Sequence, residues 1–285
     1  MSEPRSWLFV PADSEKKIGK ALESAADALI FDLEDSVAPD RKAHAREVLK
    51  SLPGRSGGPQ WWVRINPLRS EEHRLDLELL GIADLYGVVL PKAESGADVA
   101  ELAHRTGNIP VHAIVTETAA SLFGLLSYRD PRSPLAAMSW GAEDLSAALG
   151  AASKYDENGE LSFTYRLARS LCLAGAVAAG VQPVDGVFAD FRDEAGLLAE
   201  ARAAAREGFT GKLAIHPAQV EPINAAFTPS PEEVSHALEI VSAFEAQPAA
   251  GVMSVGGKMV DRPHLLQARR VLERASQGGP DGNDR

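Results

Sequence analysis

A short, nearly all-apolar segment followed by a helical segment recurs eight times along this chain of 285 residues. The apolar segments have the length of buried strands, and they span residues 7–11, 28–31, 61–66, 87–92, 111–118, 135–141, 184–189 and 212–217. The helical segments begin after Ser14 and then span residues 39–52, 70–80, 97–105, 119–128, 165–179, 194–207 and 219–227. Eight strand-helix units in order predict an α/β fold of the (β/α)₈ TIM-barrel type and argue against an open doubly wound sheet.

The first strand is not followed by a nucleotide-binding turn. It ends in Val10-Pro11-Ala12-Asp13, where a dinucleotide-binding fold would have a G-x-G-x-x-G sequence. A Walker A sequence is also missing. We expect the barrel to span residues 1–228, a C-terminal helical extension with a lid segment to span 229–277, and residues 278–285 to be disordered. Within the extension, a turn-rich piece at 251–263 separates two helices.

Composition sets the class of protein and of ligand. Hydrophobic residues make up 45% of the chain, enough for a full core, and 29 basic against 40 acidic residues give a net charge of −11. This balance argues against a nucleic-acid surface and favours a small ligand held by local positive groups. The single cysteine, Cys172, excludes an intrachain disulfide framework and is typical of a reducing cytoplasm. The sequence has no signal-peptide pattern and no membrane-spanning apolar run, so we expect no membrane partner.

Acidic side chains follow two neighbouring strands of the predicted barrel. The strand at 111–118 carries Glu117 at its end, and the strand at 135–141 is followed by Glu143 and Asp144. Ligands bind at the carboxyl edge of parallel strands, and two acids there predict a hard divalent cation with oxygen ligands. Two alternatives stay open: Glu117 can be a buried structural partner of an arginine, and Glu143 can be the ligand while Asp144 caps the next helix.

Further charged residues end other predicted strands. Arg64 ends the third strand, Lys92 the fourth, and Glu34 and Asp35 belong to the acidic run after the second. Adjacent residues of a strand point to opposite faces, so only one of these two acids can face the mouth directly. From the sequence alone, Arg64 serves equally well as a salt-bridge partner or in catalysis. His216, before a proline, is interpreted as structural.

Taken together, these segments resemble the citrate lyase β-subunit family, within the wider group of malyl-CoA and citramalyl-CoA lyases and related 2-oxoacid aldolases. Each motif is short, but they occur in the family's order from about residue 5 to 275. The matching segments are 5–11, 32–37, 64–66, 91–92, 117–118, 141–144, 215–219 and 257–263.

The resemblance implies a barrel that binds Mg²⁺ through Glu117 and Asp144, with Arg64 near the reacting carbonyl. It also implies a homo-oligomer, a trimer or a pair of trimers, in which the C-terminal segment of one subunit covers the active site of its neighbour. Asp261 occupies the position of a lid aspartate that does acid/base work in relatives acting on free CoA thioesters. Its presence favours such an enzyme over a citrate lyase β-subunit that acts on an acyl-carrier thioester within a complex.

The implied reaction is a reverse Claisen or aldol cleavage of a β-hydroxyacyl-CoA to a 2-oxoacid and acetyl-CoA, with possible thioesterase activity. Arg64 would stabilise the enolate or clamp a carboxylate, and Glu34 and Asp35 would support it. Backbone N–H groups of Gly141 and Ala142 could bind the substrate carboxylate. The basic residues expected near the CoA phosphates are Arg5, Lys16, Lys17 and Lys92, of which Lys92 could instead lie at the reaction centre. A further alternative is a non-catalytic barrel that binds 2-oxoacids.

Overall fold

The computed structural model describes residues 3–54, 57–82 and 84–277. Eight parallel strands form a closed barrel in chain order, and β1 pairs with β8 through Trp7 and Leu213. The predicted barrel is confirmed. Its strands are β1 (Ser6–Pro11), β2 (Ala28–Asp32), β3 (Gln60–Arg64), β4 (Leu85–Leu90), β5 (Val111–Ile114), β6 (Leu135–Ser139), β7 (Gln182–Asp185) and β8 (Gly211–Ala214).

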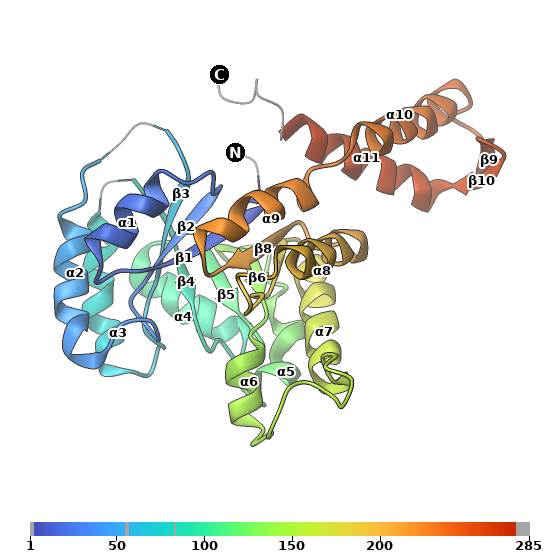
Figure 1. Cartoon of the computed structure of the whole chain (residues 1–285). Helices are drawn as coiled ribbons and strands as arrows, with labels where there is room; N and C mark the ends of the chain where they lie inside the picture. Colours follow the sequence, from blue (N-terminus) through green and yellow to red (C-terminus); the bar gives the residue numbers. More distant parts are fainter. Residues whose placement is uncertain (1–2, 55–56, 83, 278–285) are drawn as a thin grey trace. The chain divides into compact units, whose positions relative to one another are not determined.

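Helices α1 to α8 surround these strands (Figure 1). Local sequence sets several of their ends: Ser14, Ser70 and Asp193 accept backbone N–H groups at helix starts, and Gly107, Gly180 and Gly208 end helices in the left-handed conformation. The helices are α1 (Glu15–Leu22), α2 (Lys42–Lys50), α3 (Glu71–Asp76), α4 (Gly96–Thr106), α5 (Ser121–Gly124), α6 (Ala142–Ala148), α7 (Phe163–Ala179), α8 (Glu194–Glu207) and α9 (Val220–Phe227).

Side chains from all eight strands fill the inside of the barrel. The buried cluster contains Trp7, Ala28, Ile30, Trp62, Val89, Ile114, Ala137, Val184 and Leu213. The rings of Trp7 and Trp62 lie 5.0 Å apart, and His112 meets Trp7 edge-on at 4.6 Å. Gly87 makes room for Trp62, because a Cβ at Gly87 would lie 2.4 Å from the indole. The interior is therefore a packed core, and the chemistry of the molecule belongs to the loops at its rim.

Contacts between Cα atoms divide the chain within α9, and a second compact unit begins at Ala225. This unit contains α10 (Pro231–Ala246), β9 (Val252–Val255), β10 (Lys258–Asp261) and α11 (Arg262–Gln277). Its small core joins both helices to the hairpin through Ala237, Ile240, Phe244, Val255, Val260 and Ala268. The predicted disordered tail, 278–285, lies outside the described residues.

The segment 251–263, which the sequence analysis describes as a turn-rich piece, contains a hairpin. β9 and β10 are antiparallel, and the turn between them has φ of +56° at Gly256 and +77° at Gly257. Two positive φ angles are what a two-residue turn of type I′ requires, and glycine adopts them without strain. A Gly-Gly pair between two strand-like segments was therefore the available signal.

No helix in the described part of the chain is both long and apolar enough to span a bilayer.

Candidate active site at the barrel mouth

Charged side chains gather where five neighbouring strands end. Asp32 and Arg64 are the last residues of β2 and β3, and Lys92, Glu117 and Asp144 follow β4, β5 and β6. Because the strands are parallel, all five residues lie at the same rim of the barrel, the carboxyl-terminal mouth. Four of the five were predicted as site residues, and Asp32 was not.

Arg64 is fixed by two carboxylates. Its Nε and Nη2 each donate to one oxygen of Asp32 at 2.7 Å, and its Nη1 lies 2.8 Å from Oε2 of Glu34. The guanidinium also lies 4.8 Å from the ring centre of Phe9. Burial opposes the charge on Asp32, but the bonds from Arg64 outweigh burial and lower the pKa of Asp32. A bidentate pair of this kind holds the guanidinium in one orientation at the mouth.

Lys92 connects the predicted acids. Its ammonium contacts Glu34, and it lies 3.5 Å from Oδ2 of Asp35 and 3.2 Å from Oδ1 of Asp144. Its backbone N–H donates to Oε2 of Glu117 at 2.5 Å, with Lys92 itself in the left-handed region at φ +53°. Burial works against the charged lysine, but the carboxylates prevail and its pKa is raised. Lys92 therefore lies at the centre of the cluster.

Glu117 is buried beside Lys92, with 4% of its surface exposed. Burial raises its pKa to about 8, and the charges of Asp144 and Glu34 add to the shift. Gly141 packs against it so closely that a Cβ at Gly141 would lie 2.7 Å from Cγ of Glu117. Because the charged form of Glu117 is unfavourable here, a cation bound beside it would stabilise that form.

Glu143 and Asp144, which the sequence left as alternative metal ligands, contact different partners. Glu143 is directed to Lys154, whereas Asp144 contacts Lys92. Both lie in the first turn of α6. The geometry favours Asp144 as the member of the site. The N–H of Gly141, predicted to bind the substrate, already donates to Oγ1 of Thr116 at 3.2 Å, so the contribution of Gly141 is its close approach to Glu117. Ala142 is the first residue of α6.

Glu34 and Asp35 lie in the loop after β2 and not on the strand itself, which ends at Asp32. Glu34 is buried between Arg64 and Lys92. Asp35 is exposed, and among the described residues Lys92 is its ion-pair partner in the cluster. The expectation that one acid faces the site more directly than the other therefore agrees with this placement, although the alternation of a strand is not its cause.

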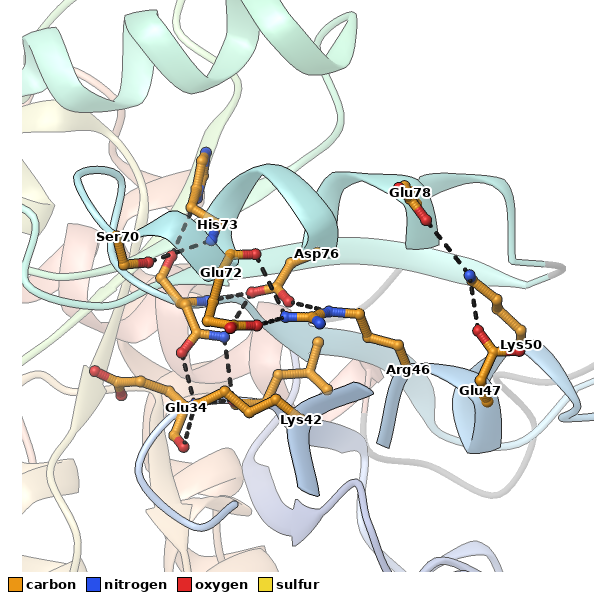
Figure 2. A network of polar contacts seen from close by, with 12 residues as sticks. Glu34, Lys42, Arg46, Glu47, Lys50, Ser70, Glu72, His73, Asp76 and Glu78 are labelled. Carbon is orange, nitrogen blue, oxygen red and sulfur yellow. Dashed lines mark hydrogen bonds and ion pairs between the residues drawn. The ribbon is translucent and has the colours of Figure 1, made fainter. Parts of the chain in front are cut away.

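A buried polar network holds the backbone of the Glu34 loop (Figure 2). The ammonium of Lys42 donates to the carbonyl oxygens of Leu33 at 2.7 Å and Glu34 at 3.0 Å, and to Oδ1 of Asn66 at 2.7 Å. Asn66 in turn donates to Asp76 at 2.7 Å, and Asp76 accepts from Nε of Arg46 at 2.8 Å. This network was missed, because Lys42 and Arg46 occupy helix positions that sequence analysis takes for solvent-exposed.

The remaining predicted residues lie elsewhere. Arg5 precedes β1 and is paired with Asp27 at 2.8 Å, so it lies at the opposite rim and does not join the site. Lys16 is exposed in the first turn of α1, directly after the mouth end of β1. Asp261, at the end of β10, lies 2.5 Å from Nδ1 of His264, and this contact lowers the pKa of Asp261.

No three His, Cys, Asp or Glu side chains in the described ranges form a ready-made metal cage. Glu117 and Asp144 instead offer two carboxylates, both in contact with Lys92. Mg²⁺ commonly binds through one or two carboxylates and takes its other ligands from water and substrate. The donor set therefore fits magnesium better than zinc, which prefers nitrogen and sulfur.

Comparisons with known proteins identify the family of this chain. A family model described as HpcH/HpaI aldolase/citrate lyase matches residues 5–217, and one described as C-C bond lyase of the TIM-barrel fold matches 162–279. The chain belongs to the HpcH/HpaI aldolase/citrate lyase family. The expected resemblance is thereby confirmed.

Members of the HpcH/HpaI family similar to this chain include enzymes of thioester metabolism. A (3S)-malyl-CoA thioesterase of Cereibacter sphaeroides is 38% identical over 275 residues, covering 95% of this chain and 94% of the relative. The mitochondrial citramalyl-CoA lyase of Mus musculus is 35% identical over 298 residues, covering 95% and 86%. The crystal structure of CitE from Mycobacterium tuberculosis with magnesium, acetoacetate and coenzyme A has a TM-score of 0.83 and 38% identity, covering 95% of this chain and 98% of that one.

Proposed function

We propose that this protein is a Mg²⁺-dependent carbon–carbon lyase that cleaves a β-hydroxyacyl-CoA of the malyl, citramalyl or citryl type to a 2-oxoacid and acetyl-CoA. The observation that carries the proposal is the meeting of Glu117, Asp144 and Arg64 around Lys92 at one barrel mouth. Relatives support it, because family members act on such thioesters and one was solved with magnesium, an oxoacid and coenzyme A.

Glu117 and Asp144 would hold the metal. Oε2 of Glu117 accepts the N–H of Lys92, and Asp144 keeps partial exposure. When bound there, Mg²⁺ would supply Lewis-acid polarisation of the substrate carbonyl. Gly141 lets the chain after β6 approach Glu117 closely, because a Cβ at this position would lie 3.1 Å from Oε1 of the carboxylate.

Arg64 is positioned for the charge that develops during cleavage. In the reaction the hydroxyl proton passes to a base, the carbon–carbon bond breaks, and its electron pair becomes the enolate of the acetyl thioester, which is then protonated on carbon. Arg64 stays charged throughout and is held by Asp32 and Glu34, so it can stabilise an oxyanion without reorganising. Removing such a donor costs about 10²–10³ in rate. Lys92 provides a second fixed positive charge beside the acids.

The direct experiment measures 2-oxoacid release from purified protein with malyl-, citramalyl- and citryl-CoA and Mg²⁺. We expect turnover on at least one thioester, its loss on chelation, and its recovery with added Mg²⁺. Glu117→Gln and Asp144→Asn should each lose metal affinity in calorimetry, while Glu143→Gln, the neighbouring acid, should keep it. A folded protein inactive on the whole panel would contradict the lyase assignment.

Thioester hydrolysis is a second candidate activity, favoured by the 38% identity to a (3S)-malyl-CoA thioesterase. The two reactions have different products from malyl-CoA: cleavage gives glyoxylate and acetyl-CoA, whereas hydrolysis gives malate and free CoA. Free thiol detected without acetyl-CoA would assign hydrolysis. Co-purification with an acyl carrier and a transferase would instead support a citrate lyase β-subunit that depends on its complex.

Asp261 and oligomerisation belong to the same proposal. We expect a homo-oligomer, a trimer or hexamer, in which Asp261 from one copy serves as acid or base at the mouth of its neighbour. Its lowered pKa keeps it ionised and able to accept the hydroxyl proton. Mixing two inactive variants, Arg64→Ala and Asp261→Ala, should restore part of the activity if each site uses two chains. We also expect a cytoplasmic location, because the chain has a single cysteine and no disulfide framework.

A further inference from the structure

Three buried side chains with polar ends form a row across β6, β7 and β8, on the side of the barrel that faces the helices. Val184 belongs to the cluster inside the barrel, so the next residue, Asp185, points outward. Lys212 is the partner of Asp185 in the register of β7 with β8. Ser139 is the partner of Val184, so the residue after it, Trp140, comes level with the row. Trp140, Asp185 and Lys212 are all buried.

Asp185 accepts hydrogen bonds from three directions. Its Oδ1 accepts from Nε1 of Trp140 at 2.8 Å and from Nε of Arg169 at 2.7 Å. Its Oδ2 accepts from Nζ of Lys212 at 2.8 Å, and Lys212 also donates to Glu200 at 2.8 Å. Burial opposes the charge on Asp185, but Lys212 and Arg169 outweigh burial and lower the pKa of Asp185 to about 2. We call Asp185, Arg169 and Lys212 the Asp185 anchor, and it presents an ionised, fixed carboxylate to the indole of Trp140.

The backbone of Trp140 leads directly to the two acids proposed to bind the metal. The next residue is Gly141, at which a Cβ would lie 2.7 Å from Cγ of Glu117. Asp144 follows three residues later, in the first turn of α6. The indole also packs against Gly186, where a Cβ would lie 2.9 Å from Nε1 of Trp140. The segment that carries Gly141 and Asp144 therefore begins at an indole that is fixed by a charged hydrogen bond and by close packing.

We propose that Asp185 is a positioning residue for the metal site, because it fixes the indole of Trp140 and thereby the placement of the segment after β6 that carries Asp144. This inference rests on the proposed function, in which Asp144 and Glu117 bind Mg²⁺. Removing a group that orients the ligands of a metal typically weakens metal affinity about 10- to 100-fold. Here the effect passes through the backbone after β6, so losing the bond should weaken metal binding while both ligands remain.

The bond from the indole can be removed without touching the ion pairs of the Asp185 anchor. Trp140→Phe lacks the N–H donor but keeps an aromatic ring, and we expect it to bind Mg²⁺ about 10- to 100-fold more weakly than the wild type in calorimetric titration with the metal alone. Trp7→Phe is the matched control, because Trp7 is also buried and its Nε1 donates to the carbonyl oxygen of Pro4 at 3.1 Å, before β1 at the opposite rim. The control should lose stability in urea unfolding but keep wild-type Mg²⁺ affinity.

A second substitution tests whether Asp185 acts through the indole. Asp185→Asn should weaken Mg²⁺ affinity in the wild type and change it less than about twofold in Trp140→Phe, since the effects of coupled residues are not additive. Equal factors in both backgrounds would contradict the positioning role. If Asp185→Asn does not fold, the comparison of Trp140→Phe with Trp7→Phe decides alone.

The same measurements distinguish this inference from the proposed function. Wild-type Mg²⁺ affinity in Trp140→Phe, or an equal loss of affinity in Trp7→Phe, would overturn the positioning role of Asp185 and leave the lyase intact. Absence of turnover on all thioesters, with Mg²⁺ affinity still dependent on Trp140 and Asp185, would overturn the lyase and leave the positioning role.

Discussion

Replacing Lys42 with Met is expected to slow turnover, although Lys42 does not reach the mouth. An ammonium group has three N–H donors, and here each has a buried acceptor: the carbonyl oxygens of Leu33 and Glu34, and the amide of Asn66. Two of these acceptors belong to the loop that directs the Glu34 carboxylate to Arg64 and Lys92. Lys42 is therefore a positioning residue for the Arg64 cluster.

The size of the effect follows from the bonds lost. Each buried acceptor left without a donor costs about 1–3 kcal/mol. Removing the ammonium also removes the cost of burying its charge, which offsets part of this loss. We therefore expect the free energy of unfolding to fall by about 2–4 kcal/mol. A shift of the Glu34 loop by about 1 Å would lower kcat by about 10- to 100-fold, because misplacement on that scale costs up to about 10² in rate.

A double-mutant cycle separates positioning from simple destabilisation. If Lys42 acts through Glu34, then Lys42→Met should lower kcat in the wild type and change it less than about twofold in Glu34→Gln, since coupled residues are not additive. Lys50→Met is the control: it lies on the same helix, but Lys50 is 39% exposed and pairs with Glu47 and Glu78 (Figure 2). Equal factors for Lys42→Met in both backgrounds, or full kcat with only reduced stability, would refute the reasoning.

Three further changes test the barrel, the site and the hairpin. Burial lowers the pKa of His112 to about 3, below its unfolded value of about 6.5. Between these two values the unfolded chain binds one more proton, so the free energy of unfolding falls with decreasing pH by up to about 1.4 kcal/mol per pH unit. In urea unfolding, His112→Asn should lose stability less steeply with acid than the wild type, and equal slopes would contradict this. Gly141→Ala should displace Glu117 and weaken Mg²⁺ affinity about tenfold or more, because disturbing the groups that orient a metal ligand lowers metal affinity about 10- to 100-fold. An unchanged affinity in calorimetry would count against this. Gly257→Ala should destabilise the hairpin by about 1–2 kcal/mol through its positive φ, seen as faster hydrogen exchange in β9 and β10 only.

The barrel could be predicted because its signal is local and repeated. Each apolar segment and each helix cap is set by neighbours in sequence, and eight repeats leave few other folds. The hairpin was missed for a related reason: its strands are four residues long, and their sequences, Val-Met-Ser-Val and Lys-Met-Val-Asp, lack the strict apolar alternation that marks a half-buried strand. Their pairing depends on packing between α10 and α11, which a local pattern does not report.

Strand direction decided which charged residues could reach the site. Arg64, Lys92, Glu117 and Asp144 come at or after the carboxyl ends of their strands, and all four meet at the mouth. Arg5 comes before its strand, so the same rule would have placed it at the opposite rim, where it pairs with Asp27.

Hydrogen-bond partners could not be predicted in the same way, because they often belong to segments that are distant in the sequence. The pairing of Lys42 with Asn66 joins the helix after β2 to the loop after β3, and no spacing within either segment encodes it. Lys42 is a buried lysine whose three acceptors are uncharged oxygens, and burying such a charge is costly unless its neighbours are held in place. Lys42 therefore couples the position of the Glu34 loop to the loop after β3 that carries Asn66.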